Sequence, residues 1–356
     1  MNAFRLVPFC VLLAACEHAA PFVPEAYGPD GPFPQLPAQL TFNPGADLMP
    51  AWLPGAAGIL YSVERLDRVD RDHCLAELPP GGGVIRRSVC GTTVSDDSIN
   101  ALDNPAVSDD GRLVYVRSSA SLRFGRPLGP LTQQLVLTTL DAPGVPTRVL
   151  QPIPAATPGG RSYQAISHIG WLGPSRLVYL EETVRYPLPC QTCERDTVRT
   201  GVELIAIDFS GATPVLAVVP TTDSASSVAV GATGDTIFFT RNGDSRVYRH
   251  AFSTGQTDTV FDFGSAGIAR DLAYANGRVV AVVGGNVTYV ADSVLGASQL
   301  DRGGELHVVT LASGTETVFG GTLTFFRRPA FAPGGARVVV EGWTDRSSDL
   351  WLVDVP

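Results

Sequence analysis

The sequence predicts an all-β protein, a six-bladed β-propeller of four-stranded blades that spans residues 38–356. Three observations predict this fold. A hairpin motif recurs six times at intervals of about 45 to 65 residues, a second hairpin follows most copies, and the region lacks helical periodicity. Units of about four strands that repeat at such intervals are typical of β-propellers.

The recurring hairpin has the same three parts in every copy. A short apolar segment leads into a turn rich in Pro, Asp, Asn and Gly, and a run of Val, Ile, Leu, Tyr and Phe follows. The turn residues provide the fixed φ, the local hydrogen bonds and the positive φ that tight turns require. The apolar runs have the composition of β-strands. The copies lie at residues 49–61, 104–116, 169–180, 228–239, 271–282 and 328–340.

The second hairpin is expected to supply the two outer strands of a blade. Its first strand is predicted at residues 134–140, 202–207, 247–252 and 305–311, and each of these runs is followed by a turn that contains glycine. The two hairpins together make a unit of about four strands.

The final unit is one strand short. It contains strand candidates at residues 329–332, 338–342 and 350–353, and residues 39–42 form an unpaired strand candidate before the first copy. We expect this N-terminal strand to complete the last blade as its outer strand. Such pairing closes the ring and leaves no open seam.

The first residues have the features of an export signal. Arg5 is the only charge before Cys16, and residues 6–15 are almost wholly apolar. This stretch is too short for a membrane span, which needs about 20 residues. The sequence Leu-Ala-Ala-Cys at residues 13–16 resembles the lipobox of bacterial lipoproteins, in which the cysteine is acylated and becomes the first mature residue. The alternative is an ordinary signal peptide that ends near a cysteine.

The lipoprotein resemblance implies a signal peptide at residues 1–15 and a lipidated Cys16. The lipid would hold the protein in the bacterial cell envelope, facing the periplasm or the cell surface. Residues 16–37 contain six prolines, which favour an extended backbone. We therefore expect a tether between the lipid and the propeller.

The composition excludes one class of function. The net charge is −9, the isoelectric point is about 5.0, and no basic run occurs, so a nucleic-acid-binding surface is not expected. Apolar residues make up 44% of the chain, which can supply a sizeable core. We expect a monomer without a bound cofactor.

Four cysteines follow the signal region, namely Cys74, Cys90, Cys190 and Cys193, an even number that suits an oxidising compartment. Three connectivities are open, and we favour Cys74–Cys90 and Cys190–Cys193 because each pair is local. The second pair also has the spacing of a redox or half-zinc motif. It lies between strand candidates and not at a helix start, so a structural disulfide is the favoured interpretation and no metal site is expected.

Two copies of the recurring hairpin resemble a known repeat. Residues 50–55 read Pro-Ala-Trp-Leu-Pro-Gly, and residues 108–111 read Ser-Asp-Asp-Gly before Leu113, Val114 and Tyr115. These sequences resemble the WD40-like P-x-W-S-P-D-G repeat, which builds the six-bladed propeller of TolB and related periplasmic proteins. The resemblance implies that fold for residues 38–356. TolB has an α/β domain before its propeller, whereas a proline-rich segment precedes the repeats here.

The sequence lacks the familiar catalytic motifs. It contains no Gly-x-Ser-x-Gly elbow and no histidine pair at metal-ligand spacing. We therefore expect no enzymatic activity and a TolB-like scaffold that binds a ligand, an envelope protein or a peptide. The alternative hypothesis is a propeller lyase or hydrolase with carboxylates across the central channel, for which Asp47 and Asp271 are the candidates.

Candidate binding residues lie where the chain enters each inner strand, because the loops at these points ring the mouth of a propeller's channel. Among the five histidines, only His168 stands directly before an inner strand. The predicted mouth residues are Asp47, Asn104, His168, Ser227, Arg270, Asp271, Arg327 and Arg328.

Overall fold

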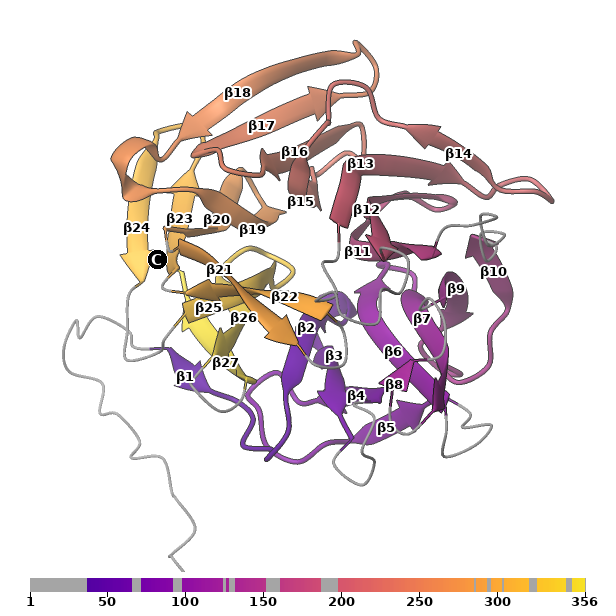
Figure 1. Cartoon of the computed structure of the whole chain (residues 1–356). Helices are drawn as coiled ribbons and strands as arrows, with labels where there is room; N and C mark the ends of the chain where they lie inside the picture. The colour runs from indigo at the N-terminus through magenta and orange to yellow at the C-terminus, as the bar shows by residue number, and fades with distance from the viewer. Residues whose placement is uncertain are drawn as a thin grey trace, which may run out of the picture. The chain divides into compact units, whose positions relative to one another are not determined.

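The computed structural model describes residues 37–65, 72–91, 98–123, 126–127, 132–151, 161–186, 198–284, 286–292, 296–302, 304–319, 325–343 and 348–355. These residues form six four-stranded antiparallel blades in a ring, which confirms the predicted six-bladed propeller (Figure 1). The export signal, Cys16, the segment at 17–36 and the Cys190–Cys193 pair lie outside the described residues.

In each blade the chain runs outward from an inner strand beside the channel. Blade one contains β2 (Asp47–Trp52), β3 (Ile59–Glu64), β4 (His73–Leu78) and β5 (Arg87–Cys90). Blade two contains β6 (Ser98–Val107), β7 (Arg112–Arg123), β9 (Thr132–Thr139) and β10 (Arg148–Gln151), with β8 (Arg126–Pro127) paired to the end of β7. Blade three contains β11 (Arg161–Gly173), β12 (Arg176–Tyr186), β13 (Val198–Asp208) and β14 (Val215–Val218).

The remaining three blades repeat this order. Blade four contains β15 (Ala225–Val230), β16 (Thr236–Arg241), β17 (Arg246–Ala251) and β18 (Gln256–Asp262). Blade five contains β19 (Ala269–Ala275), β20 (Arg278–Val283), β23 (Glu305–Thr310) and β24 (Thr315–Phe319). Blade six contains β25 (Phe325–Phe331), β26 (Arg337–Trp343), β27 (Ser348–Asp354) and β1 (Ala38–Gln39).

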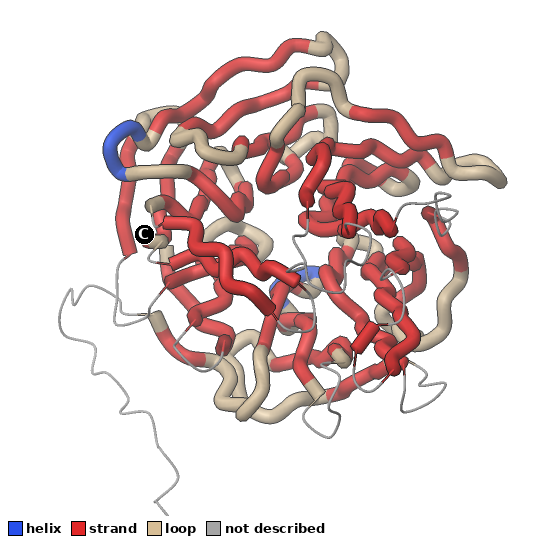
Figure 2. The backbone as a smooth tube through the Cα atoms, viewed as in Figure 1, coloured by secondary structure: helices blue, strands red, loops and turns tan. Residues whose placement is uncertain are grey.

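Three further elements complete the described structure. The strands β21 (Asn286–Asp292) and β22 (Gly296–Arg302) form a hairpin between β20 and β23 that the sequence analysis did not predict. Two short 3₁₀ turns, η1 (Pro54–Ala56) and η2 (Gly264–Ala266), are the helical segments of the described residues (Figure 2). Within the same residues, no helix is both long and apolar enough to cross a membrane.

The N-terminal strand closes the ring as predicted. Ala38 of β1 faces Leu352 of β27, and the amide of Leu40 donates to the carbonyl of Leu350 at 2.7 Å. The hydroxyl of Thr41 accepts from the Leu350 amide at 2.8 Å. The paired strand is shorter than the expected residues 39–42, because the chain turns away after Thr41 and leaves Phe42 exposed.

The hydrophobic core is divided among the interfaces between neighbouring blades. One buried cluster joins blades three and four, where Val178 packs with Ile237 and Phe239. The cluster at the seam joins Trp52 of blade one to Val339 of blade six. The described residues contain six such clusters, so each blade is held by the apolar faces of both neighbours.

Candidate functional site

Five of the six inner strands carry a β-bulge at the same position of the repeat, and β15 carries one at its start. In β19, Arg270 pairs with Val282 and Ala273 pairs with Val280, so two residues between them stand opposite one position of β20. A bulge re-aims side chains locally. One residue in each copy stands two positions before an alanine or glycine. We name these six residues the channel ring: Met49, Asn104, His168, Ser227, Asp271 and Arg328.

Five members of the channel ring adopt left-handed backbone conformations. Their φ angles are 53° at Met49, 50° at Asn104, 50° at His168, 40° at Asp271 and 48° at Arg328. A residue other than glycine pays on the order of 1 kcal/mol for this conformation, and such strain is concentrated at functional sites. The strain therefore marks the channel ring as a candidate site.

Side chains of the channel ring meet across the channel. His168 of blade three donates from Nε2 to Oδ1 of Asp271 in blade five at 3.0 Å. The amide of Arg328 in blade six donates to Oδ2 of the same carboxylate at 3.3 Å, and its Nη1 group donates to Oδ1 of Asn104 in blade two at 3.3 Å. These contacts link four blades and make a polar floor in the channel.

The charges of this floor follow from burial and from the arginines. Burial, reinforced by the charge of Arg328, lowers the pKa of His168 to about 4, so the imidazole is neutral near pH 7. Burial opposes ionisation of Asp271, but the hydrogen bond from His168 and the charges of Arg328 and Arg327 hold its pKa well below the usual range. The floor thus pairs an ionised carboxylate with a neutral histidine.

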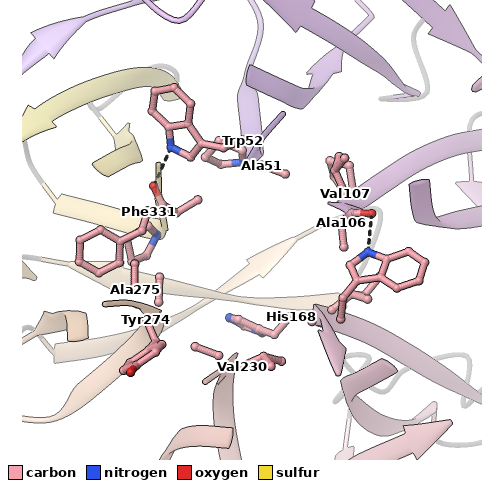
Figure 3. Close-up of a pocket in the computed structure, with 18 of the residues that line it drawn as sticks. Ala51, Trp52, Ala106, Val107, His168, Val230, Tyr274, Ala275 and Phe331 are labelled. Atoms are coloured by element: carbon pink, nitrogen blue, oxygen red, sulfur yellow. Dashed lines mark hydrogen bonds between the residues drawn. The ribbon is translucent and has the colours of Figure 1, made fainter. Parts of the chain in front are cut away.

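A pocket of about 410 Å³ lies against the channel ring. Small residues make room for it, because the position two residues after each ring member is alanine or glycine in all six copies, as at Ala51, Gly170 and Ala273. The pocket extends toward the first turn of the blades, where Pro54 and Asp109 contribute to its lining. Figure 3 shows His168 at the pocket among side chains from several blades.

Two tryptophans shape the pocket wall in equivalent ways. Trp52 donates from Nε1 to the carbonyl of Ala330 at 3.0 Å, and Trp171 donates from Nε1 to the carbonyl of Ala106 at 3.1 Å. Each bond joins a blade to the preceding blade, and both tryptophans line the pocket. Figure 3 shows Trp52 at this wall. The wall is therefore apolar and fixed by the same contacts that assemble the ring.

The predicted mouth residues lie in different parts of the structure, and most of them belong to the channel ring. Asn104, His168, Ser227, Asp271 and Arg328 all belong to the channel ring, whereas Arg270 and Arg327 directly precede ring members. Five of the eight predicted residues therefore occupy equivalent positions. Four of them line the pocket, which reaches from the bulges toward the turns that leave the inner strands, whereas Ser227 is fully buried and does not line it.

Asp47 is placed apart from the pocket. Its side chain is fully buried at the seam, where Asn43 donates from Nδ2 to both carboxylate oxygens at 2.9 Å. Asp47 does not line the pocket, and Asp271 has His168 as its partner. Met49 is the ring member that the sequence analysis missed, and aligning the six copies on the alanine or glycine would have found it.

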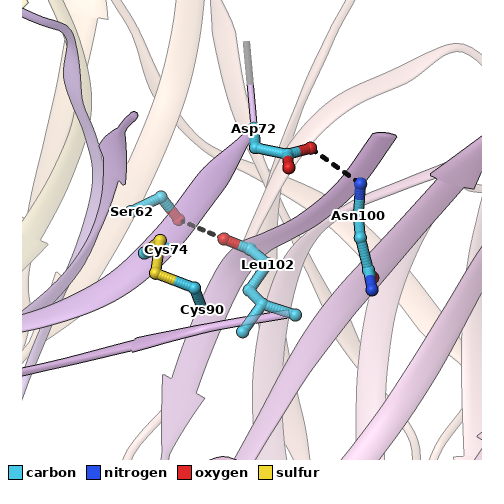
Figure 4. The surroundings of a disulfide bond; sticks show 6 residues. All are labelled: Ser62, Asp72, Cys74, Cys90, Asn100 and Leu102. Atoms are coloured by element: carbon cyan, nitrogen blue, oxygen red, sulfur yellow. Dashed lines mark hydrogen bonds between the residues drawn. A yellow bond between two sulfur atoms is a disulfide. The ribbon is translucent and has the colours of Figure 1, made fainter. Parts of the chain in front are cut away.

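The disulfide between Cys74 and Cys90, favoured by the sequence, is present in blade one. The two cysteines face each other on β4 and β5, with their Cα atoms 4.3 Å apart (Figure 4). Beside it, Ser62 donates from Oγ to the carbonyl of Leu102 in blade two at 3.1 Å. Within the described residues, no group of three or more histidine, cysteine or acidic side chains is arranged to hold a metal ion.

No protein-family description matches the sequence, and no curated protein matches it. Among solved structures, a putative TolB from Agrobacterium tumefaciens is similar with a TM-score of 0.52 and 16% identity, over 89% of this chain and 93% of that chain. TolB from Acinetobacter baumannii has a TM-score of 0.51 and 13% identity, over 84% of this chain and 64% of that chain. This chain thus spans less than two thirds of the Acinetobacter protein.

A third similar structure corrects one expectation. A protein from Xanthomonas campestris described as a gluconolactonase has a TM-score of 0.53 and 13% identity, over 89% of this chain and 88% of that chain. The expectation of a non-enzymatic protein was wrong, because the fold also carries enzymes. A motif search is a poor guide here, since a propeller assembles a site from single residues of different blades. The chain is a six-bladed β-propeller similar in fold to TolB and to a gluconolactonase.

Proposed function

We propose that this protein is a lipid-anchored propeller of the bacterial cell envelope that binds a short peptide in its central pocket. The channel ring is the observation that carries the proposal. Five strained residues from five blades converge on one pocket. Residues held in this way are suited to binding, because their positions are fixed before the ligand arrives.

The size and lining of the pocket support a peptide end as the ligand. A pocket of about 410 Å³ falls within the range of sites for small ligands. Its wall is apolar, with Trp52, Trp171 and Phe331, and its floor is polar, with Asn104 and Arg328. An apolar side chain on the wall and a polar end group on the floor would use both surfaces.

The pocket gives the first prediction. Replacing Ala273 with leucine places a larger side chain in the pocket lining without removing a polar group. A mixed library of acetylated tripeptides, made as free acids and as amides, is equilibrated with wild-type protein and with the variant. We expect the wild type to retain peptides and Ala273→Leu to retain about 10-fold less, because a blocked pocket loses its apolar contacts.

The control for this experiment is Ala266→Leu, because Ala266 is exposed in η2 and does not line the pocket. This variant should retain the same peptides as the wild type. Equal retention by all three proteins would refute peptide binding in the pocket, and so would a wild type that retains nothing.

The anchor gives the second prediction. Replacing Cys16 with serine should abolish incorporation of labelled palmitate and move the protein from the membrane fraction to the soluble fraction. The thermal midpoint of the propeller should not change, since β1 and β27 close the ring without residues before Ala38. Retention of the variant in the membrane fraction, or a lower midpoint, would show that Cys16 has another role.

A second candidate function is acid–base catalysis, and one observation favours it. The hydroxyl of Ser167 lies 3.1 Å from Nδ1 of His168, whose Nε2 faces Asp271. A neutral imidazole between a hydroxyl and a carboxylate can accept the hydroxyl proton while the carboxylate stabilises the cation. Hydrolysis of p-nitrophenyl acetate by the wild type, Ser167→Ala and His168→Gln tests this, and equal rates would eliminate it.

A further inference from the structure

We infer that the group bound at the floor of the pocket is a carboxylate, held by the side chains of Arg328 and Asn104. This inference rests on the proposed function and specifies the chemistry of the ligand. It follows from a comparison of the acceptors of the floor, which already have hydrogen-bond partners, with its donors, some of which have none.

The acceptors of the floor are engaged. Both carboxylate oxygens of Asp271 accept hydrogen bonds, one from His168 and one from the amide of Arg328. The amide oxygen of Asn104 accepts from Arg328, and Nδ1 of His168 faces the hydroxyl of Ser167. Each of these acceptors already has one partner, so a ligand that donates would have to share an occupied acceptor.

Two donor groups of the floor have N–H protons that meet no acceptor among the described residues. The guanidinium of Arg328 uses Nη1 toward Asn104, and its Nε lies 3.8 Å from Oδ1 of Asp271. Among the residues that the structure describes, no acceptor lies within hydrogen-bond distance of its Nη2 group. Asn104 uses one Nδ2 proton toward the carbonyl of Ile166 at 3.3 Å, so its second proton is available. These groups can donate to an oxygen ligand that brings its own acceptors.

Arg328 is the cation of the floor that lines the pocket, and acidic groups surround it. The guanidinium groups of Arg327 and Arg328 lie 4.0 and 3.8 Å from the single carboxylate of Asp271. The charges of Glu341 and Asp103 also act on Arg328. The oxygens of Glu341 accept from the amide of Met49 and from Nε1 of Trp343. A carboxylate ligand would therefore be held by charge-assisted hydrogen bonds to the guanidinium of Arg328, and not by an excess of positive charge in the floor.

A carboxylate is a better match than a hydroxylated ligand such as a sugar. Two carboxylate oxygens can accept from Arg328 and Asn104 together, whereas a sugar hydroxyl that donates would share an acceptor that already has a partner. Gly170 and Ala273 leave space beside the floor, and the wall next to it is apolar. In a peptide ligand, the group is the carboxyl terminus.

The tripeptide library tests this inference separately from the proposed function. We expect the wild type to retain free acids and not the matching amides. Retention of acids and amides alike would overturn the carboxylate while the peptide site stands. Retention of neither would overturn both.

Titration calorimetry then measures one matched pair, acetyl-Ala-Ala-Phe and its amide. The acid should bind the wild type about 10-fold or more tightly than the amide, because a charged acceptor strengthens the bond to a guanidinium. Arg328→Gln should reduce this preference to about twofold or less, and Arg328→Lys should keep part of it as a point charge.

The control is Arg337→Gln, since Arg337 lies over the ring of Trp52 at 5.4 Å and does not line the pocket. This variant should keep the full preference for the acid. A wild type that binds acid and amide equally, or neither of them, would overturn the inference whether or not the variants fold. An Arg328→Gln protein that unfolds at the wild-type midpoint and still prefers the acid would also overturn it.

Discussion

Replacing Gly234 with alanine is expected to lower the free energy of unfolding by about 3 kcal/mol or more. Gly234 lies in the first turn of blade four with a φ of 69°, and a Cβ atom there would stand 1.9 Å from the carbonyl oxygen of Leu172 in blade three. The contact is with backbone, so neither blade can yield by a change of rotamer. The turn must move away from blade three, which opens the apolar interface between the two blades.

Gly243 provides the matched control for this variant. It also lies in a turn of blade four, with a φ of 76°, but no heavy atom stands within 4 Å of the position of its Cβ. Gly243→Ala therefore carries only the left-handed backbone cost of roughly 1 to 2 kcal/mol. Denaturant unfolding of both variants measures the difference, which reports the close approach of the blades. Equal destabilisation would mean that the blades separate at no cost at this point.

The repeat explains why most of the fold could be predicted. Each copy encodes its own turn and strands locally, so hairpins such as 104–116 could be recognised without any knowledge of distant contacts. The closing strand could be predicted because the last unit lacked one. The β21–β22 hairpin was missed because it interrupts the repeat in one blade only.

The site was predicted in its members but not in its connections. Asn104, His168 and Asp271 could be found because they share one position of the repeat. The bond between His168 and Asp271 joins residues 103 positions apart, and no local pattern encodes which blades face each other across a channel. Asp47 was misleading for the same reason, since it lies only two residues before Met49 but points into the seam and not into the pocket.

Two buried groups are expected to change the stability in opposite directions over the same pH range. Burial raises the pKa of Asp47 to about 6, so the folded protein takes up this proton before the unfolded chain does. Stability from Asp47 is therefore gained as the pH falls from about 6 toward 4. His168 has a pKa of about 4 when folded and 6.5 as a model group, so the unfolded chain takes up this proton first. Stability from His168 is therefore lost as the pH falls from about 6.5 toward 4.

Each effect corresponds to about 3 kcal/mol, since one unit of pKa difference is worth about 1.4 kcal/mol. In the wild type they oppose each other and flatten the dependence of stability on pH. Single variants should expose them. Relative to the wild type, Asp47→Asn should lose stability as the pH falls from 7 to 4, and His168→Gln should gain stability over the same range.

Denaturant midpoints of the wild type, both single variants and the double variant, measured from pH 4 to pH 7.5, test this pair. Other titrating groups are common to all four proteins. Asp271 is the group that His168 contacts, and the amide introduced by His168→Gln can still donate to it, so the remaining contributions largely cancel when each curve is compared with the wild type. Asp47 lies at the seam and His168 in the channel, and the two share no hydrogen-bond partner, so the double variant should again show a flat difference. If the difference curves of the two single variants had the same sign, either Asp47 would not be buried as a carboxylate or His168 would not be buried as a neutral imidazole. In the second case, the polar floor would not contain a neutral His168, and the hydrogen bonds that this imidazole makes with Asp271 and Ser167 would have other donors and acceptors.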